Sequence, residues 1–344
     1  MKLRPTVIKI LVIIVASAVV FFSVFVFIYI SANFGKSSLS KEKKLTTINI
    51  AFQDWVGYGP FYLAQEKGFF KDEGLELVFI DEQLDSARRD AFYAGMLDCE
   101  AGTIDLLVSK RAQDAPIVAV LELDRSFGGD AIVAKEEIKS LEDLVGKRVV
   151  FSRDDVSDTF ISYLFYKKGL PFNNIIIISR SPENVSEVFL DGEADAVVTW
   201  EPWITKSLNR SGAHILISSK DVSGVIVDTL NIREDIVKNN PELVRGLMRG
   251  WFKAVKYYRE HPEEANRIIA KHYNISPKEY EKSTKLLKWT DYTEQLKIGK
   301  SGSWHEVFDA IAKIKFENGR ITNKPDAKSA INTTLLERLY ENSK

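Results

Sequence analysis

Cysteine is almost absent from this chain of 344 residues, in which Cys99 is the only one. A single thiol excludes an intrachain disulfide, a zinc site built from thiolates and an iron–sulfur cluster. Histidine is also scarce, and the four histidines lack the short spacing of a metalloprotease helix. We therefore expect Cys99 to be a small buried residue, and we expect no metal and no cofactor.

The chain also has little net charge of either sign. Its formal charge is -1, and residues 1–32 hold Lys2, Arg4 and Lys9 without any acid, so the remainder carries about -4. Proteins that bind nucleic acids usually have a strongly basic surface. We therefore expect no nucleic-acid partner.

The longest segment without charge lies near the amino terminus. Residues 10–32 are 23 consecutive uncharged positions, which as a helix would extend about 35 Å and could cross a bilayer. Cleavable signals are usually shorter, and residues 31–36 lack a clear cleavage site. We expect residues 1–32 to be an uncleaved membrane anchor, with a removed signal peptide as the alternative.

The charges around this segment predict its orientation. Lys2, Arg4 and Lys9 are expected to stay on the cytoplasmic side. The body would then be extracytoplasmic, on a linker formed by residues 33–46, or secreted or periplasmic if the segment is cleaved. No cysteine lies near the end of the apolar run, so a lipoprotein-type anchor is excluded.

From residue 45 onward, short β-rich runs alternate with helical stretches, a pattern typical of α/β proteins. The predicted strands are 47–52, 75–80, 117–123, 131–134, 148–151, 175–179, 196–199, 215–217 and 225–230. The clearest helix is 241–259, whose apolar residues form one stripe. After Arg233 we expect mainly helices, with a short linker at 299–303.

With 45% apolar residues the chain can bury a large core, and its length favours two lobes. We expect lobe 1 to comprise residues 45–124 and 227–344, and lobe 2 to comprise residues 125–226. Two chain crossings, near 124–134 and 223–228, would form a hinge between them.

One loop carries the first functional signal. Asp54, Trp55 and Tyr58 follow the predicted strand 47–52 and precede a helix that begins near Pro60. Open α/β sheets usually bind ligands at the carboxyl ends of their strands. The loop therefore indicates either the edge of a binding site or an ordinary turn with surface aromatic residues.

Several motifs together resemble one protein family, over about residues 47–340. They are GYGPFYLA at 57–64, EKGFFKDEGL at 66–75, DRSFGGDAIVA at 124–134, SLEDLVGK at 140–147 and DAVVTWEPW at 195–203. In order and spacing they are similar to solute-binding proteins of ABC importers of the nitrate, sulfonate and taurine group, which includes binders of thiamine pyrimidine precursors. The resemblance implies a two-lobed clamp, like type II periplasmic binding proteins, that delivers a small molecule to a permease and its ATPase and performs no chemistry.

Candidate ligand contacts all fall at predicted strand ends or helix starts. They are Asp54, Trp55, Tyr58, Thr103, Asp124, Ser126, Asp155, Ser157, Asp158, Thr159, Trp200, Glu201 and Asp228. The segment 159–168 is predicted to be a helix, whose free amide groups favour an anion such as a sulfonate. Alternatively Asp155, Ser157 and Asp158 only cap that helix, and the remaining acids are solvated surface charges.

The acidity of these candidates leaves the ligand open. Sulfonate binders of this type often have Gly, Ser or His where this chain reads RDDVSDT at 153–159, and two extra carboxylates there discourage an anion. Arg125, Arg153 or Lys206 could offset that charge. A sulfonate or taurine-like solute and a neutral or cationic pyrimidine precursor therefore both remain candidates.

Two other functions are weaker candidates. A pyrimidine-synthesising enzyme of the same fold would need a cysteine-rich segment, and no nucleophile triad or phosphate loop is present either. A receptor's sensing domain would need a signalling part, whereas only about nine residues precede the apolar segment. We therefore expect a binding protein that is not an enzyme.

Overall fold

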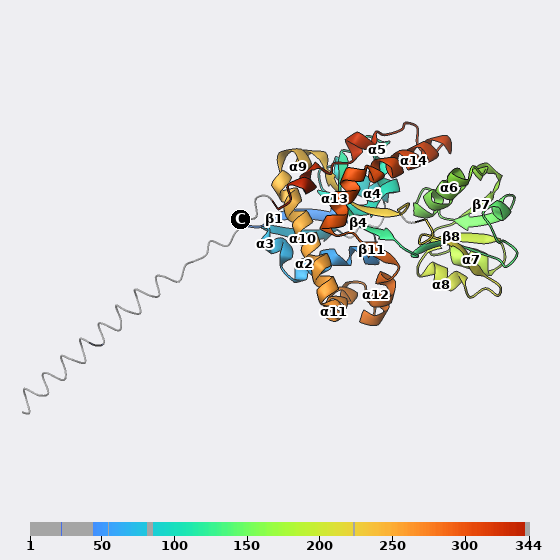
Figure 1. Cartoon of the computed structure of the whole chain (residues 1–344), viewed down its shortest axis with the longest axis horizontal. Helices are drawn as coiled ribbons and strands as arrows, with labels where there is room; N and C mark the ends of the chain where they lie inside the picture. The colour runs from blue at the N-terminus through green and yellow to red at the C-terminus, as the bar shows by residue number, and fades with distance from the viewer. Residues whose placement is uncertain (1–21, 23–43, 54, 81–84, 223, 341–344) are drawn as a thin grey trace, which may run out of the picture. The chain divides into compact units, whose positions relative to one another are not determined.

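The computed structural model describes residue 22 and residues 44–53, 55–80, 85–222 and 224–340. Residues 45–344 form one compact unit, in which the strands make two separate sheets (Figure 1). No helix within the described residues combines the length and apolar composition that a bilayer span requires. The predicted anchor lies outside those residues apart from Phe22, and Asp54 also lies outside them.

One sheet has six strands in the order β11-β4-β10-β3-β1-β2, and the other has five in the order β7-β6-β8-β5-β9. Lobe 1 and lobe 2 denote the parts of the chain built on the first and the second sheet. The strands are β1 Thr46–Ala51, β2 Leu75–Ile80, β3 Cys99–Thr103, β4 Ile117–Ser126, β5 Asp130–Ala134, β6 Arg148–Phe151, β7 Ile176–Ser179, β8 Ala196–Trp200, β9 His214–Ser218, β10 Val227–Arg233 and β11 Leu287–Trp289. Both sheets are mixed, with β1, β2 and β3 parallel and β10 antiparallel to its neighbours β3 and β4.

Helices occupy most of the connections. They are α2 Gly59–Glu66, α3 Phe69–Asp72, α4 Asp85–Tyr93, α5 Ile104–Arg111, α6 Val156–Lys168, α7 Val185–Leu190, α8 Trp203–Ser207, α9 Glu234–Asn239, α10 Pro241–Glu260, α11 Pro262–His272, α12 Pro277–Thr284, α13 Tyr292–Ser301, α14 Ser303–Glu317, α15 Ala327–Ala330 and α16 Thr334–Glu337. Short 3-10 helices span Val56–Tyr58, Glu142–Leu144 and Phe172–Asn174.

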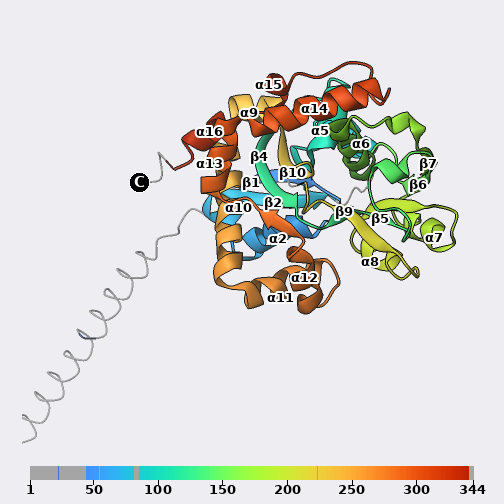
Figure 2. The same ribbon diagram turned by 45° about the vertical axis from the view of Figure 1, so that its right-hand side comes forward.

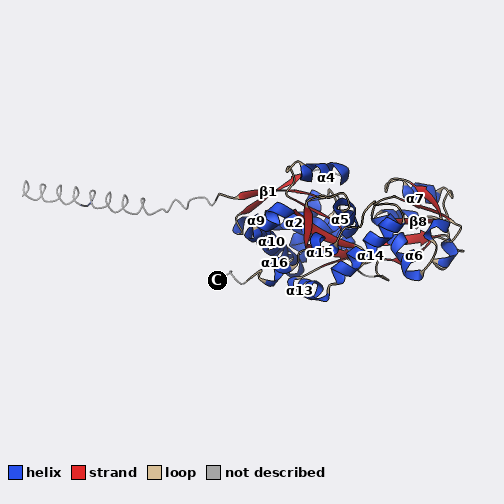
Figure 3. Ribbon diagram, turned by 90° about the horizontal axis from the view of Figure 1, so that it is seen from above, coloured by secondary structure: helices blue, strands red, loops and turns tan. Residues whose placement is uncertain are grey.

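Each sheet has hydrophobic clusters on both faces, so helices cover it on both sides (Figure 3). In lobe 1 one cluster joins the sheet to α2 and α10, and the other joins it to α5 and α14. In lobe 2 the clusters use α6 on one side and α7 on the other. Ligand access is consequently limited to strand ends and sheet edges, where the chain leaves the cores.

The chain passes between the sheets twice, from β4 to β5 and from β9 to β10, and β4 lies beside β10 (Figure 2). β4 extends to Ser126, two residues past the predicted end of lobe 1 at residue 124. The two connections are held together where Ser126 Oγ and Ser219 Oγ lie 2.7 Å apart. Ser219 Oγ also accepts a hydrogen bond from the Gly128 amide at 2.7 Å.

Glycine in α10 allows this helix to pack closely on α3. A Cβ atom at Gly250 would overlap the ring of Phe70, which is fully buried. We predict that Gly250→Ala lowers the free energy of unfolding by about 1–3 kcal/mol, because the added methyl group overpacks the core. Chemical denaturation measures this change.

Gly246, one turn earlier in α10, provides the matched control. A Cβ atom there would lie 3.2 Å from Leu75 Cδ1, and alanine is a better helix former than glycine by roughly 1 kcal/mol. Gly246→Ala should therefore change stability much less than Gly250→Ala. Equal stability of the two variants would contradict the packing argument.

Candidate functional site

The loop after β1 is held in place by aromatic side chains that come from much later in the chain. Tyr273 donates a hydrogen bond to the Trp55 carbonyl at 2.7 Å, and Tyr280 donates one to the Val56 carbonyl at 2.9 Å. Trp289 Nε1 donates to the Gly57 carbonyl at 2.7 Å. The loop is therefore a fixed part of lobe 1 rather than a surface turn.

Three candidate residues form a row across neighbouring strand ends of lobe 1. In β10, Asp228 pairs with Thr103 of β3 on one side and with Asp124 of β4 on the other. All three are buried, with Asp124 fully inaccessible and Asp228 only 3% exposed. The structure thus brings together residues that are far apart in the sequence.

The loop reaches this row with two hydrogen-bond donors. Trp55 Nε1 donates to Asp124 Oδ1 at 3.1 Å, and the Tyr58 hydroxyl donates to Asp228 Oδ1. Gly57 is required between them, because a Cβ atom there would overlap the Asp124 carboxylate and the Trp55 indole nitrogen. Asp124 Oδ2 and Thr103 Oγ1 are buried and have no hydrogen-bond partner within the described structure.

Burial determines the protonation of the row. Burial raises the pKa of Asp124 well above its ordinary value, and the neighbouring Asp228 raises it further. Burial raises the pKa of Asp228 to about 7, although the hydrogen bond from Tyr58 favours the ionised form. Burial also raises the pKa of Tyr58, so this phenol remains a donor. At neutral pH the two carboxyl groups therefore hold less than two full negative charges.

The start of α6 brings lobe 2 against lobe 1. Asp155 caps this helix by accepting a hydrogen bond from the Ser157 amide at 2.8 Å, so α6 begins three residues before the predicted Thr159. Thr159 Oγ1 donates across the lobes to Asp105 Oδ2 at 3.1 Å, and Arg320 Nη2 lies 3.0 Å from Asp158 Oδ2. These four candidates have partners within the protein, and their role as ligand contacts remains a prediction.

A pocket of about 500 Å³ lies between the lobes on the side of α11 and α12. Trp55, Tyr273 and Leu286 line it from lobe 1, and Gly129 and Glu201 line it from lobe 2. Glu201 accepts hydrogen bonds from the amide and hydroxyl groups of Thr205, and Trp200, which precedes it, is half-buried. Trp55 therefore contacts both the acidic row and this pocket.

Other candidates serve the crossing between the lobes. Ser126 forms the hydroxyl pair with Ser219. The backbone carbonyl of Asp130 accepts a hydrogen bond from the Ser219 amide at 2.8 Å. Burial raises the pKa of the Asp130 side chain to about 7. Asp130 lies in the crossing predicted near 124–134, whereas Ser219 was not among the predicted residues. No local pattern marks Ser219, because its partners are about 90 residues away.

Two of the three cations predicted to offset the acidic charge, Arg125 and Lys206, form ion pairs with glutamates instead. Arg125 Nε donates to Glu122 Oε1 at 2.8 Å, and Lys206 pairs with Glu187. Arg153 is exposed. Lys315 lies 3.2 Å from Asp105 Oδ2 and was not predicted, since only the tertiary structure brings α14 to α5.

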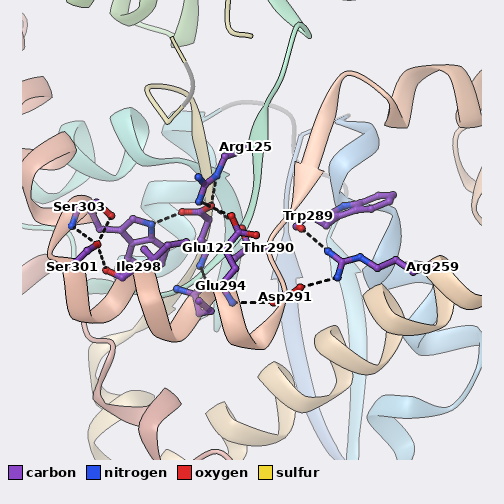
Figure 4. A network of polar contacts seen from close by, with 12 residues as sticks. Glu122, Arg125, Arg259, Trp289, Thr290, Asp291, Glu294, Ile298, Ser301 and Ser303 are labelled. Atoms are coloured by element: carbon purple, nitrogen blue, oxygen red, sulfur yellow. Dashed lines mark hydrogen bonds and ion pairs between the residues drawn. The ribbon is translucent and has the colours of Figure 1, made fainter. Parts of the chain in front are cut away.

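A buried polar network fixes β4 just before Asp124 (Figure 4). Glu122 is 1% exposed and accepts hydrogen bonds from Trp304 Nε1 at 2.6 Å and from Thr290 Oγ1 at 2.7 Å. Its amide donates to Gln295 Oε1 at 2.9 Å. The network ties β4 to α13 and α14, and so determines where Asp124 lies.

Among the described residues, no group of three or more His, Cys, Asp or Glu side chains is arranged to hold a metal ion. The arrangement instead offers buried acceptors, two aromatic donors and an interlobe pocket. It can bind a small molecule.

Comparison with known proteins gives relatives along nearly the whole chain. A Bacillus subtilis (strain 168) protein named "Putative aliphatic sulfonates-binding protein" is 23% identical over 321 residues, which cover 91% of this chain and 94% of that protein. The structure of the periplasmic aliphatic sulphonate binding protein SsuA from Escherichia coli matches with a TM-score of 0.70 at 17% identity, covering 86% of this chain and 99% of that one.

A second solved structure agrees with the first. The periplasmic nitrate-binding protein NrtA from Synechocystis PCC 6803 matches with a TM-score of 0.64 at 15% identity, covering 87% of this chain and 89% of that one. The expected α/β fold of periplasmic binding proteins is thereby confirmed, as is the resemblance inferred from the motifs. The family model described as NMT1/THI5 like matches residues 55–265, which is more than half of the chain, and this protein belongs to that family.

Proposed function

We propose that this chain is the extracytoplasmic solute-binding protein of an ABC importer, and that it captures a small organic solute between its lobes. Sulfonates, taurine-like solutes and pyrimidine precursors are the candidate classes. The relatives named above are binding proteins, and the proposed function is binding without catalysis.

The position of Trp55 is the observation that carries the proposal. Its indole nitrogen donates to the buried Asp124 in lobe 1, and it lines the interlobe pocket together with Gly129 at the crossing into lobe 2. A solute held here would contact both lobes and favour their closed arrangement. The proposed lobes are residues 45–124 with 227–344, and residues 125–226, connected by the two crossings.

A thermal-shift screen of the full-length protein tests the proposal. The screen contains alkanesulfonates, taurine, nitrate, bicarbonate and thiamine pyrimidine precursors. We predict that one of these solutes raises the unfolding midpoint in a dose-dependent way, because a ligand that binds only the folded state stabilises it. Trp55→Ala should remove this shift, since it deletes the donor to Asp124.

Trp203→Ala is the matched control, because Trp203 is half-buried in α8 and stacks with Lys206 outside the site. It should keep the ligand-induced shift. The proposal fails if no solute shifts the midpoint, or if Trp55→Ala responds like the wild type.

We also propose that residues 10–32 anchor the protein in the membrane with its body outside, and that a permease with its ATPase is the partner. The uncharged run and the cations before it support this arrangement. Mass spectrometry of the mature amino terminus, with alkaline extraction of membranes, tests the anchor. A terminus beyond residue 32 would indicate a cleaved signal peptide instead.

A further inference from the structure

We propose that the solute is a small organic cation, a protonated amine or amidine, whose N–H groups bind Asp124 and Asp228. The inference rests on the proposed solute-binding function and names the chemical class of its ligand.

In the buried row of Thr103, Asp228 and Asp124, two side-chain oxygens have no hydrogen-bond partner. Trp55 and Tyr58 supply one donor each, to Asp124 Oδ1 and Asp228 Oδ1. Asp124 Oδ2 has no partner although Asp124 is fully inaccessible, and Thr103 Oγ1 in the same row has none either. A buried carboxylate oxygen without a donor is costly, and a cationic N–H group is the donor that compensates it best.

Nearby cations of the described chain already face carboxylates. Lys315 pairs with Asp105, and Arg125 pairs with Glu122. Arg88 and Lys110 both face Glu100 in β3. Arg88 lowers the pKa of Tyr58, but burial and the two aspartates raise it by more. The charge that faces Asp124 and Asp228 is therefore mainly negative.

Amide groups at the start of α6, which could otherwise bind an anion, already have partners within the protein. Helix amino termini bind sulfonates and phosphates through free amide groups. Here the Ser157 amide donates to Asp155 Oδ1, and the Asp154 amide donates to Asp158 Oδ2 at 3.2 Å. A sulfonate in this place would have to displace two carboxylates of the protein itself.

Protonation gives the proposal a distinct signature. The groups that act on Asp124 and Asp228 are Trp55, Tyr58, Asp105, Glu122 and Asp130, of which all but Trp55 and Tyr58 are carboxyls. A bound cation favours ionised carboxylates, so protons should leave the site on binding. The binding enthalpy should then depend on the ionisation enthalpy of the buffer, and affinity should rise between pH 6 and pH 8.

Calorimetry on the full-length protein with matched pairs tests the charge of the ligand. The pairs are benzamidine with benzenesulfonate, and propylamine with propanesulfonate, together with taurine. We expect the cation of each pair to bind more tightly and to release protons. Asp124→Asn should weaken cation binding by roughly 10- to 100-fold, the loss expected for a hydrogen bond between charged groups. Asp191→Asn, at an exposed position of lobe 2, should not weaken it.

The outcomes separate this inference from the function on which it rests. Tighter binding of a sulfonate than of its matched cation overturns the inference and leaves the solute-binding function standing. Cation binding that Asp124→Asn does not weaken also overturns it. If neither cations nor anions bind, and the earlier solute screen is negative as well, the proposed function itself fails. Asp124→Asn alters a fully buried carboxyl group, and the unfolding midpoint of the variant reports whether it folds.

Discussion

Replacing Glu122 with alanine is expected to lower the free energy of unfolding by about 3–5 kcal/mol, the cost of breaking a buried ion pair from one side. The substitution would remove the acceptor for Trp304 Nε1 and Thr290 Oγ1, and the partner of Arg125. These donors are buried or partly buried, so water does not fully replace the lost carboxylate.

Chemical denaturation at neutral pH measures this effect, and Glu294→Ala is its control. Glu294 also faces Arg125, at 3.7 Å, but its side chain is 46% exposed. An exposed pair contributes less than about 1 kcal/mol. A cost for Glu122→Ala as small as that for Glu294→Ala would show that the network in Figure 4 is not a major source of stability.

The unliganded protein is expected to lose stability as pH rises from about 4 to above 7. Burial raises the pKa of Asp228, Asp130 and Asp155 to about 7 each, against 3.8 for an ordinary aspartate. Between those values the folded state binds more protons than the unfolded state, so each rise in pH favours unfolding. The stabilising effect is complete below the unfolded pKa and is lost as pH passes the folded pKa.

Asp195 in lobe 2 acts in the opposite sense. Burial would raise the pKa of Asp195, but hydrogen bonds from Arg148 and Lys135 more than offset it and hold this pKa well below its usual range. Its contribution is present above the unfolded pKa of 3.8 and is lost as pH falls below it. Stability of the unliganded protein should therefore be greatest near pH 4 to 5.

Calorimetric unfolding midpoints at pH 5, 6, 7 and 8 test this behaviour. Asp228→Asn should flatten the decline, because asparagine cannot ionise, whereas Asp191→Asn at an exposed position should keep the slope of the wild type. An unfolding midpoint that rises from pH 5 to pH 8 would contradict the conclusion that these carboxyl groups are protonated in the folded protein near pH 5 and lose their protons as the pH rises to 8.

Local pattern was sufficient for most elements of the fold. The helix predicted at 241–259 is α10, Pro241–Glu260, because its apolar stripe fits the helical period. The predicted strands 75–80 and 148–151 are β2 and β6 with the same bounds. Cys99 is buried as expected.

Two strands were missed for physical reasons. β3, Cys99–Thr103, has the sequence CEAGT, in which Thr103 is the only β-branched residue and none is aromatic, and all five residues are buried. β11, Leu287–Trp289, has three residues within a helical region and exists because it pairs with β4. Tertiary pairing, rather than local propensity, makes both segments strands.

The candidate site shows the same division. Trp55, Tyr58, Asp124 and Asp228 were named from their positions at strand ends, and the structure brings them together through hydrogen bonds. Asp155 caps α6, which was one of the two interpretations left open. The contributions of Ser219, Lys315 and Arg320 could not be predicted, because each depends on contacts with distant segments.

The sequence by itself determined the α/β class, the family and the residue types available for binding, because these follow from local periodicity and from motifs of fixed spacing. Only the tertiary structure decided which of those residues share one buried site. The protonation of Asp124 and Asp228 and the unpaired oxygen of Asp124 arise from burial and from the register of β3, β10 and β4. Desolvation and pairing depend on what surrounds a side chain in space, and most of its surroundings here come from elsewhere in the chain.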